Sequence, residues 1–351
     1  MRKFLPLLLV TTALAQSTPQ VAKSHGEESL RGVSAVSRQV AWASGTHGTY
    51  LRTTDGNTWV PQHVPGAAEL DFRAVVAFSA NEAFLMSAGP GDQSRIYHTP
   101  DGGQHWQLQF KNSDPKGFFD AMVFWDRTHG IVLGDPVADQ SGKLKFELLV
   151  TDDGQSWHPL QSENLPPALE GEGAFAASNS CIAVLPSASG SDPNTWFATG
   201  GKVARVFHSS DRGKTWQVVD TAIVHGPESA GIFSIAFRDA THGAIAGGDY
   251  KHPDQDGPNL AFTSDGGKAW TLSARHPQFY FSAVAYDRQN TGKDRVFVVG
   301  SDFILDDRPP LTMSKVGPFP DMKLNAVSAY PEGGALFVGP KGTMLQLAPL
   351  P

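Results

Sequence analysis

The sequence contains a single cysteine, Cys181, so no disulfide bond can form within the chain. None of its apolar runs is long enough to span a bilayer, which argues against a membrane-spanning protein. No long stretch has the spacing of an amphipathic helix. The chain instead has 36 glycines and 25 prolines among aromatic and β-branched residues, which is typical of short strands separated by turns. We therefore expect an all-β protein in which Cys181 is a buried small hydrophobe.

Basic residues are scarce: 28 lysines and arginines stand against 35 aspartates and glutamates, a net charge of −7. Two of them, Arg2 and Lys3, precede an apolar run, and residues 13–15 (Ala-Leu-Ala) have the small-x-small pattern of a cleavage site. Residues 1–15 are therefore predicted to be a signal peptide, cleaved after Ala15, that exports the protein to the periplasm or the cell exterior. Cleavage would leave 26 basic residues and a net charge of −9, which disfavours nucleic-acid binding.

A short sequence motif recurs five times: Ser or Thr, followed by Asp, Gly and Trp at nearly fixed spacings. Its aspartates and tryptophans are Asp55 and Trp59, Asp101 and Trp106, Asp153 and Trp157, Asp211 and Trp216, and Asp265 and Trp270. The tryptophans are 47, 51, 59 and 54 residues apart, which indicates a repeat architecture. In each copy the carboxylate can accept backbone N–H groups, the glycine can take a positive φ, and the indole can be buried between sheets. We call these segments the Asp turns and expect them to be structural, not catalytic.

A second, weaker repeat sets the number of units. Seven short runs of small or apolar residues begin at Leu30, Phe72, Phe119, Phe175, Phe233, Phe281 and Leu324. Small side chains suit innermost strands crowded around a central channel. Seven such units predict a seven-bladed β-propeller of four-stranded antiparallel blades. Second strands are expected at residues 40–45, 83–88, 130–134, 195–200, 243–248, 295–300 and 335–339.

The last unit ends after a third strand at residues 343–347, so its outer edge needs a partner. Residues 16–29 are the candidate segment for closing this blade. No linker divides the rest of the chain, and residues 30–351 are predicted to form a single propeller domain.

Candidate binding residues gather on one face of the predicted propeller. In an antiparallel blade, the entry to the first strand shares this face with the turn between the second and third strands. The residues that this logic selects around the channel mouth are Arg31, Arg73, Asp120, Asp135, Ser234, Asp249, Tyr250, Ser282, Asp302 and Asn325. Two arginines and several carboxylates around a funnel suit a polar ligand or a peptide. The alternative is that these residues only solvate the channel.

The Asp turns match the Asp-box, or BNR, repeat of sialidases, xyloglucanases and the photosystem II stability/assembly-factor family. The sequence pattern of residues 30–36, 40–45 and 48–56 resembles the repeat unit of the assembly-factor family more closely. The resemblance covers residues 30–347. It implies a seven-bladed propeller without catalytic residues. In photosynthetic members such a propeller binds a nascent reaction-centre protein through an arginine-rich face. Arg31 and Arg73 stand at the matching innermost positions, so the resemblance implies an exported protein-binding or assembly platform, as in a bacterial relative.

The alternative is a sialidase-like glycoside hydrolase or a glycan-binding propeller. Sialidase chemistry uses three arginines, a tyrosine nucleophile with a glutamate partner, and an aspartate acid/base. Tyr250 and Tyr280 are expected near the mouth, and Glu172 and Glu228 could reach it. A convergent Tyr–Glu pair with three arginines would favour this alternative.

No cofactor and no metal site are expected. The pairs Thr128-His129 and Thr241-His242 resemble metal ligands, but both precede second strands, so we interpret them as turn residues. Residues 251–257 carry oxygen ligands at alternate positions without a matching distal glutamate, which leaves calcium binding open. The expected partner is a protein or a glycan, and the protein is expected to be a monomer.

Overall fold

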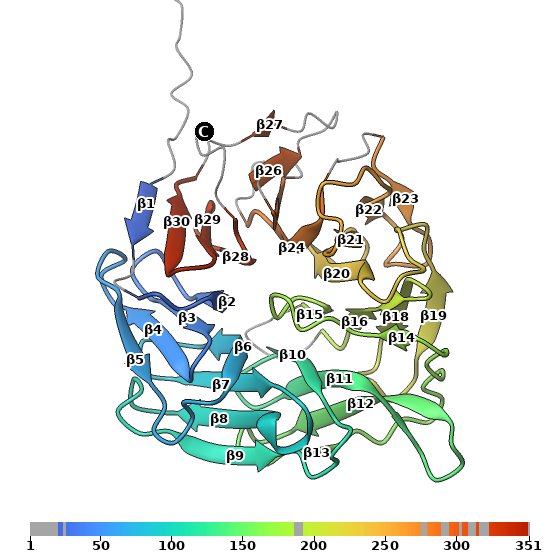
Figure 1. Ribbon diagram of the computed structural model, residues 1–351, viewed down its shortest axis with the longest axis horizontal. Helices are drawn as coiled ribbons and strands as arrows, with labels where there is room; N and C mark the ends of the chain where they lie inside the picture. The colour runs from blue at the N-terminus through green and yellow to red at the C-terminus, as the bar shows by residue number, and fades with distance from the viewer. Residues whose placement is uncertain are drawn as a thin grey trace, which may run out of the picture.

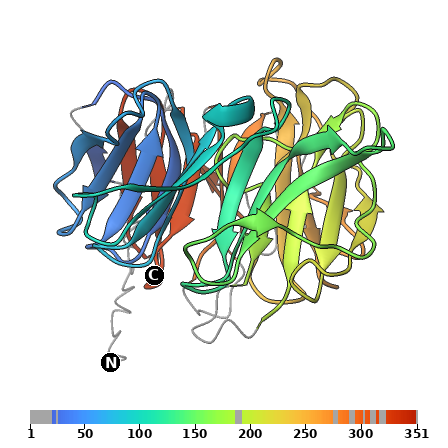
Figure 2. The same ribbon diagram turned by 90° about the horizontal axis from the view of Figure 1, so that it is seen from below.

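The computed structural model describes residues 20–23, 26–185, 192–274, 279–288, 295–301, 304–307, 314–315 and 323–349. Its strands form antiparallel sheets arranged as blades around a central axis (Figure 1). Seen from the side, the strands run between the two faces of the ring (Figure 2). The predicted signal peptide, residues 1–15, lies outside the described residues.

The first three blades are formed by consecutive strands. They contain β2 (Leu30–Ala35), β3 (Ala41–Gly45), β4 (Thr49–Thr53) and β5 (Val60–His63); β6 (Asp71–Ala77), β7 (Ala83–Ala88), β8 (Arg95–Thr99) and β9 (Gln107–Lys111); and β10 (Phe119–Phe124), β11 (Gly130–Ala138), β12 (Leu144–Thr151) and β13 (His158–Pro159). A single 3₁₀ turn, η1 (Gly91–Gln93), is described between β7 and β8.

The remaining sheets are less regular. One blade contains β15 (Ile182–Val184), β16 (Thr195–Ala198), β18 (Arg205–Ser209) and β19 (Gln217–Asp220). The next sheet contains β14 (Glu172–Gly173), β17 (Gly200–Gly201), β20 (Ala230–Phe237), β21 (Gly243–Asp249), β22 (Leu260–Thr263) and β23 (Thr271–Leu272). The last two contain β24 (Phe281–Tyr286), β25 (Val296–Gly300), β26 (Ile304–Asp307) and β27 (Ser314–Lys315); and β1 (Gln20–Lys23), β30 (Thr343–Leu347), β29 (Ala335–Val338) and β28 (Ala326–Ala329).

The prediction of seven four-stranded blades is wrong. Among the described residues, six sheets are four-stranded blades, and the other sheet has six strands because β14 and β17 extend it beyond β20. The cause is the predicted innermost strand at Phe175, which is not a strand, so its blade begins at β15 instead. Glycine permits the extra pairing, since a Cβ on Gly231 would lie 2.3 Å from the Cα of Gly200 where β17 meets β20.

The all-β propeller with four-stranded antiparallel blades is confirmed elsewhere in the ring. The runs at Leu30, Phe119 and Phe281 begin β2, β10 and β24, and those at Phe72 and Phe233 lie within β6 and β20. Each of these strands is the inner partner of the second strand predicted after it. Hydrophobic spacing and small residues therefore identify the inner strands where the repeat is regular.

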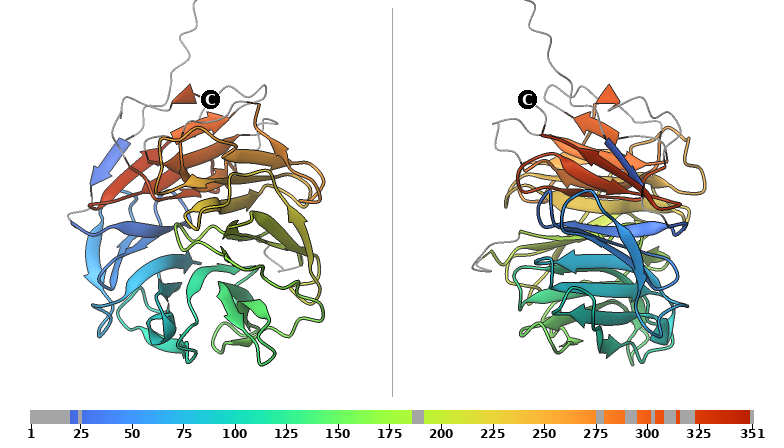
Figure 3. Two further views of the ribbon diagram at one scale, coloured as in Figure 1. Left: turned by 45° about the vertical axis from the view of Figure 1, so that its right-hand side comes forward. Right: turned by 90° about the vertical axis from the view of Figure 1, so that its left-hand side faces the viewer.

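Both ends of the described chain meet in one blade. β1 pairs antiparallel with β30, with Gln20 opposite Gln346 and Lys23 opposite Thr343 (Figure 3). This pairing covers the edge of β30 that the chain's own last strands leave open.

Each Asp turn is held by its own hydroxyl and carboxylate. In the first, Thr53 Oγ1 donates to Asp55 Oδ1 at 3.0 Å, and the same oxygen accepts the backbone N–H groups of Asn57 and Thr58. The other four turns repeat the bond from Ser or Thr to Asp. Donation by His105, first from its backbone, lowers the pKa of Asp101 to about 2. Not every indole is satisfied: Trp59 and Trp270 bury their N–H groups without a partner among the described residues.

Side-chain donors connect neighbouring sheets through these turns. A residue of one blade donates to the glycine carbonyl in the Asp turn of the next. The pairs are Tyr50 to Gly103, Gln109 to Gly154, Trp196 to Gly266 and, between the last and first sheets, Gln346 to Gly56. These bonds fix the rotation of one sheet against another.

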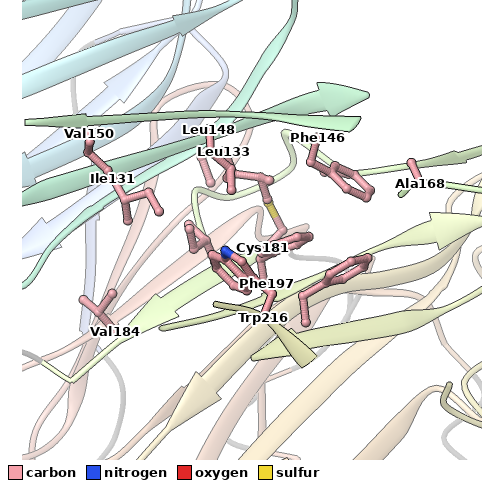
Figure 4. Close-up of a cluster of buried hydrophobic side chains, with 14 of the residues drawn as sticks. Ile131, Leu133, Phe146, Leu148, Val150, Ala168, Cys181, Val184, Phe197 and Trp216 are labelled. Carbon is pink, nitrogen blue, oxygen red and sulfur yellow. The ribbon is translucent and has the colours of Figure 1, made fainter. Parts of the chain in front are cut away.

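Apolar side chains fill the spaces between neighbouring blades. One cluster joins Ile131 and Phe146, from β11 and β12, to Phe197 and Trp216 of the next blade (Figure 4). Cys181 lies within it and is fully buried, as predicted. Burial raises the pKa of its thiol, which makes it a poor nucleophile.

The link between blades can be tested at Tyr50. Its hydroxyl donates to the Gly103 carbonyl at 2.9 Å, and the side-chain amide of Gln62 lies within hydrogen-bond distance of the same hydroxyl. Tyr50→Phe is expected to lower the free energy of unfolding by about 1–2 kcal/mol, measured by denaturant unfolding, because a partly buried carbonyl loses its donor.

Tyr97→Phe is the matched control, because the Tyr97 hydroxyl has only a 3.5 Å contact with Arg95. We expect a smaller loss for this variant. Equal losses in the two variants would contradict the stabilising role of the Tyr50–Gly103 bond.

Candidate functional site

A β-bulge in the innermost strand of several blades sets the direction of one side chain. The β2–β3 ladder skips Arg31, and the same shift skips Arg73 in β6, Asp120 in β10 and Ser282 in β24. A bulge re-aims the extra residue. These four side chains consequently line one end of the central channel, which we call the entry mouth.

The entry mouth contains a pocket of about 510 Å³, within the usual size range of ligand sites. The predicted residues that line it are Arg31, Arg73, Asp120, Asp135, Tyr250, Ser282 and Asn325. Seven of the ten candidates, two of them from the blade of β10 and β11 and the others from other blades, therefore come together in the structure. That they bind a ligand stays a prediction.

The other three candidates lie elsewhere. The bulge in β20 falls at Phe233, one residue before Ser234, so Phe233 lines the pocket and the hydroxyl of Ser234 accepts the backbone N–H of a neighbouring strand. Asp249 is buried at the end of β21, with its Oδ2 2.8 Å from Nδ1 of His252. Asp302 lies outside the described residues.

The run at Phe175, predicted as an innermost strand, instead forms part of the pocket lining. Residues 174–180, here called the crossing segment, run through the channel. Arg73 Nη1 donates to the Ala176 carbonyl at 2.7 Å, and Ser178 Oγ donates to the Ser282 carbonyl at 2.7 Å. Arg73 and Ser282 belong to blades that are not neighbours in the ring (Figure 1), so the segment spans the channel.

The crossing segment also separates two pockets. Ala174 and Ala176 line the entry mouth, whereas Asn179 lines a pocket of about 830 Å³ at the other end of the channel. Asn179 has a φ of 61°, a left-handed conformation that asparagine tolerates better than most residues. Its Oδ1 accepts the backbone N–H of Met122 at 2.7 Å, which ties the turn to β10.

Two arginines supply positive charge to the entry mouth, with Lys323 also on the wall. Arg73 is engaged: its Nε donates to Asp71 Oδ2 at 2.6 Å, and its Nη1 donates to the crossing segment. Arg31 Nε is buried without a hydrogen-bond partner in the described part of the chain. Burial, and then repulsion by Arg73, lower the pKa of Arg31. Such a guanidinium is complementary to an anion that would satisfy its donors.

Two carboxyl groups form the acidic wall. Asp120 is 1% exposed, and its Oδ2 is buried without a partner among the described residues. Asp135 Oδ1 accepts the backbone N–H of Ala174 at 2.9 Å. Burial, and then the charge of Asp135, raise the pKa of Asp120 well above its usual range, and burial raises the pKa of Asp135. Both carboxyls therefore keep their protons to a higher pH than ordinary aspartates do.

Aromatic rings complete the pocket: Tyr250 and Tyr280 were expected near the mouth, whereas Phe175 and Phe233 were not among the predicted lining residues. Phe175 stacks on Phe233 with a centroid distance of 3.8 Å, and Tyr280 meets Phe233 edge-on at 4.8 Å. Tyr250 lies at the rim and is 49% exposed. A ligand at the entry mouth would therefore meet an apolar side as well as charged groups.

The catalytic set of a sialidase does not assemble here. Glu172 forms a buried ion pair with Arg205, away from the pocket. Glu228 does not line the pocket either, and the described lining contains no glutamate and two arginines. The Tyr–Glu pair that would favour the glycosidase alternative is therefore absent from the described lining.

Two histidines considered as metal ligands lie in turns. Nδ1 of His129 is 2.8 Å from Asp126 Oδ2, and Nδ1 of His242 is 3.0 Å from Asp239 Oδ1. Each aspartate also accepts the backbone N–H of its histidine. Across the described residues, including 251–257, no three His, Cys, Asp or Glu side chains gather closely enough to hold a metal ion. The same residues contain no helix with the length and apolarity needed to cross a membrane.

Comparisons with known proteins agree with the fold. The sequence matches the family model of the DUF6242 beta propeller domain over residues 9–246. No curated protein matches it.

Several solved structures are similar in fold. YCF48 bound to D1 peptide has a TM-score of 0.60 at 17% identity, covering 97% of this chain and 99% of that one. YCF48 from Cyanidioschyzon merolae has a TM-score of 0.62 at 17% identity, covering 94% and 99%. Streptogramin B lyase has a TM-score of 0.67 at 10% identity, covering 96% and 99%. At these identities the similarity shows the fold alone. One of the similar structures is a lyase and others are YCF48, so the fold does not indicate the activity.

The raised pKa of Asp120 predicts an unusual pH dependence of stability. As the pH rises from about 4, the unfolded chain releases this proton and the folded chain keeps it, so the wild type loses stability. Asp120→Asn removes this loss. The free energy of unfolding of Asp120→Asn, relative to the wild type, is therefore expected to increase by up to about 1.4 kcal/mol for each pH unit. Denaturant unfolding at several pH values measures this difference.

Asp153→Asn is the contrasting variant. Donors in its Asp turn, first the backbone N–H of Ser156, lower the pKa of Asp153, so its stabilisation is present at neutral pH and lost as the pH falls through that pKa. Asp153→Asn is therefore expected to destabilise at neutral pH, with a difference that shrinks in acid. Parallel pH profiles for wild type and Asp120→Asn would contradict the assignment of a raised pKa to Asp120.

Proposed function

The chain belongs to the DUF6242 beta propeller domain family, and from this premise we propose that it is an exported, non-catalytic platform that binds a protein partner at the entry mouth. The observation that carries the proposal is the guanidinium of Arg31. Its Nε is buried and has no partner in the described chain, and Arg31 lines, with Arg73, a pocket whose rim is exposed at Tyr250. A partner that brings an anionic group would satisfy it.

The similarity to YCF48, a photosystem II assembly factor, supports a platform role. One of the similar structures is YCF48 bound to D1 peptide, so a propeller of this shape can receive a peptide. The chain as a whole is acidic, and the positive charge at the entry mouth is local. Local charge of this kind directs a partner's acidic segment to one place on an otherwise repelling surface.

A glycan ligand is the second candidate. The exposed ring of Tyr250, next to polar groups in a pocket, is the kind of surface that binds sugars. The described lining lacks a glutamate, so binding without hydrolysis is the form of this alternative that the site favours.

Export predicts a defined mature terminus. If residues 1–15 are a signal peptide, the protein recovered outside the cytoplasm begins at Gln16. Cell fractionation followed by mass spectrometry of the intact protein measures this. Recovery only in the cytoplasmic fraction with residues 1–15 retained would contradict export.

The platform role predicts a partner that depends on the two arginines. Mature protein used as bait in its own extracytoplasmic fraction is expected to capture a protein that Arg31→Glu/Arg73→Glu does not capture. The two introduced glutamates would repel the partner's anionic group, which would otherwise have to lie in the pocket beside their carboxylates. The measurement is quantitative mass spectrometry of the captured proteins, with circular dichroism to show that the variant is folded.

Arg127→Glu/Lys214→Glu is the matched control, since both side chains are exposed and lie in turns outside the pocket. It makes the same change in charge and is expected to capture the same partner as the wild type. Equal capture by both double variants would contradict binding at the entry mouth. No protein capture, together with wild-type binding on a glycan array, would favour the second candidate.

A further inference from the structure

Asp120 carries the pocket's least explained polar atom. Its Oδ2 is buried, has no hydrogen-bond partner among the described residues, and belongs to a side chain that lines the entry mouth. A buried polar atom without a partner destabilises the folded state, because it has lost its hydrogen bonds to water. Folded proteins keep such atoms mostly where a ligand or water completes them.

The groups around Asp120 do not complete it. From β6, Arg73 directs its Nε to Asp71 and its Nη1 to the Ala176 carbonyl, so it acts on Asp120 through charge alone. From β11, Asp135 adds a second negative group when ionised. The backbone N–H of Ala176 is a donor to Asp120, and the Cys181 thiol is within electrostatic range.

These surroundings favour the neutral carboxyl. Burial and Asp135 together outweigh the opposing effect of Arg73 and Ala176, and the pKa of Asp120 is raised well above its usual range. A neutral carboxyl differs from a carboxylate in one respect that matters here: it has an O–H to donate. Asp120 thereby offers a donor to whatever occupies the pocket.

A carboxylate is the complementary group. One of its oxygens can accept from the guanidinium of Arg31, while the other accepts from Asp120 in a short, charge-assisted O–H···O⁻ bond. A phosphate dianion would also leave Asp120 protonated, because added negative charge raises the pKa of a carboxyl, but it brings a second negative charge beside Asp135 for the same two donors. A neutral hydroxyl would leave Arg31 without a counter-charge.

We propose that the entry mouth binds a ligand carboxylate, held by Arg31 and Arg73, to which Asp120 donates a hydrogen bond from its protonated side chain. The proposal rests on the proposed function, since the carboxylate would belong to the partner's chain terminus or to an acidic side chain. It adds a proton-dependent specificity to that role. Ionisation of Asp120 removes the donor and adds a repelling charge, so binding weakens as the pH rises.

The test uses acetate as the probe and inorganic phosphate as the comparison. Isothermal titration of the mature protein with each anion is run from about pH 5 to pH 9. Acetate is expected to bind with constant affinity at low pH and to weaken about tenfold per pH unit once Asp120 ionises, because one proton is held with the ligand. Phosphate is expected to bind more weakly than acetate throughout.

Asp120→Asn distinguishes the effect of ionising the side chain from the effect of its size and shape. The amide keeps a donor and cannot ionise, so acetate affinity should stay near the wild-type low-pH value across the range. Asp152→Asn is the matched control: it removes an acid whose side chain is 72% exposed, outside the pocket, and should leave the wild-type profile unchanged. Asp135→Asn should move the wild-type midpoint to lower pH, since a negative neighbour of Asp120 is lost.

Three results would overturn the proposal. They are absence of acetate binding by the wild type at pH 5, a pH profile for Asp120→Asn that equals the wild type, and phosphate binding tighter than acetate. If Asp120→Asn does not fold, carbon-13 NMR of the wild type decides, because the Asp120 carboxyl must titrate well above the range of ordinary aspartates, and at a still higher pH with acetate bound.

The two proposals fail in different ways. Arg31→Gln/Arg73→Gln should lose acetate at every pH, which tests the anion site itself. Loss of acetate in that variant with an unchanged profile in Asp120→Asn would keep the entry mouth as the binding site and reject the role of Asp120. Normal acetate binding by the arginine variant would reject the entry mouth for both.

Discussion

Side-chain donors that reach from one blade into the Asp turn of the next are the interaction on which the rest of this ring depends. The four acceptors are backbone carbonyls of turn glycines, in positions that exist only because a Ser or Thr hydroxyl and an Asp carboxylate close each turn. Each bond fixes one sheet's rotation relative to its neighbour. The bulges in the inner strands of three neighbouring blades then place Arg31, Arg73 and Asp120 side by side on the wall of the channel.

Aspartate has two opposite roles in this chain. In the Asp turns, several donors surround each carboxylate and lower its pKa, so the charge is permanent and the turn is rigid. At the entry mouth, burial and a second carboxyl raise the pKa of Asp120. The same side chain therefore acts as a fixed anion at the rim of the ring and as a proton-holding group at its centre. The environment, not the residue type, determines which.

The regular part of the fold could be predicted from the sequence because hydrophobic runs and turn residues are local signals. Inner strands beginning at Leu30, Phe119 and Phe281 lie where the spacing placed them. The count of seven four-stranded blades was wrong because the run at Phe175 satisfies the same pattern, yet crosses the channel. Its contacts with Arg73 and Ser282 are with residues about a hundred positions away, and no local pattern encodes them. The sequence signal available there was the asparagine at 179, a residue type that tolerates the left-handed conformation found at this position.

The candidate site was predicted to the extent that it follows from strand position. A bulge shifts the exposed residue by one, which is why Phe233 replaced Ser234, and the hydrophobic pattern does not reveal bulges. Tyr280, in the connection before β24, was expected near the mouth and lines the pocket. The ring of Phe175 enters from the crossing segment, so its approach depends on the tertiary structure of the closed ring.

The pairing of β1 with β30 has a consequence for how the molecule is made. Gln20 is among the first described residues to leave the ribosome, and its partner, Gln346, is among the last. Formation of this sheet must therefore wait until synthesis of the chain is nearly finished. The contact has a very long loop to close, and pairings of high contact order form slowly. Until then β30 and the first blade both lack their final neighbour. A chain interrupted before β30 would leave β1 without its partner, and an unpaired strand edge of this kind is open to proteolysis and aggregation.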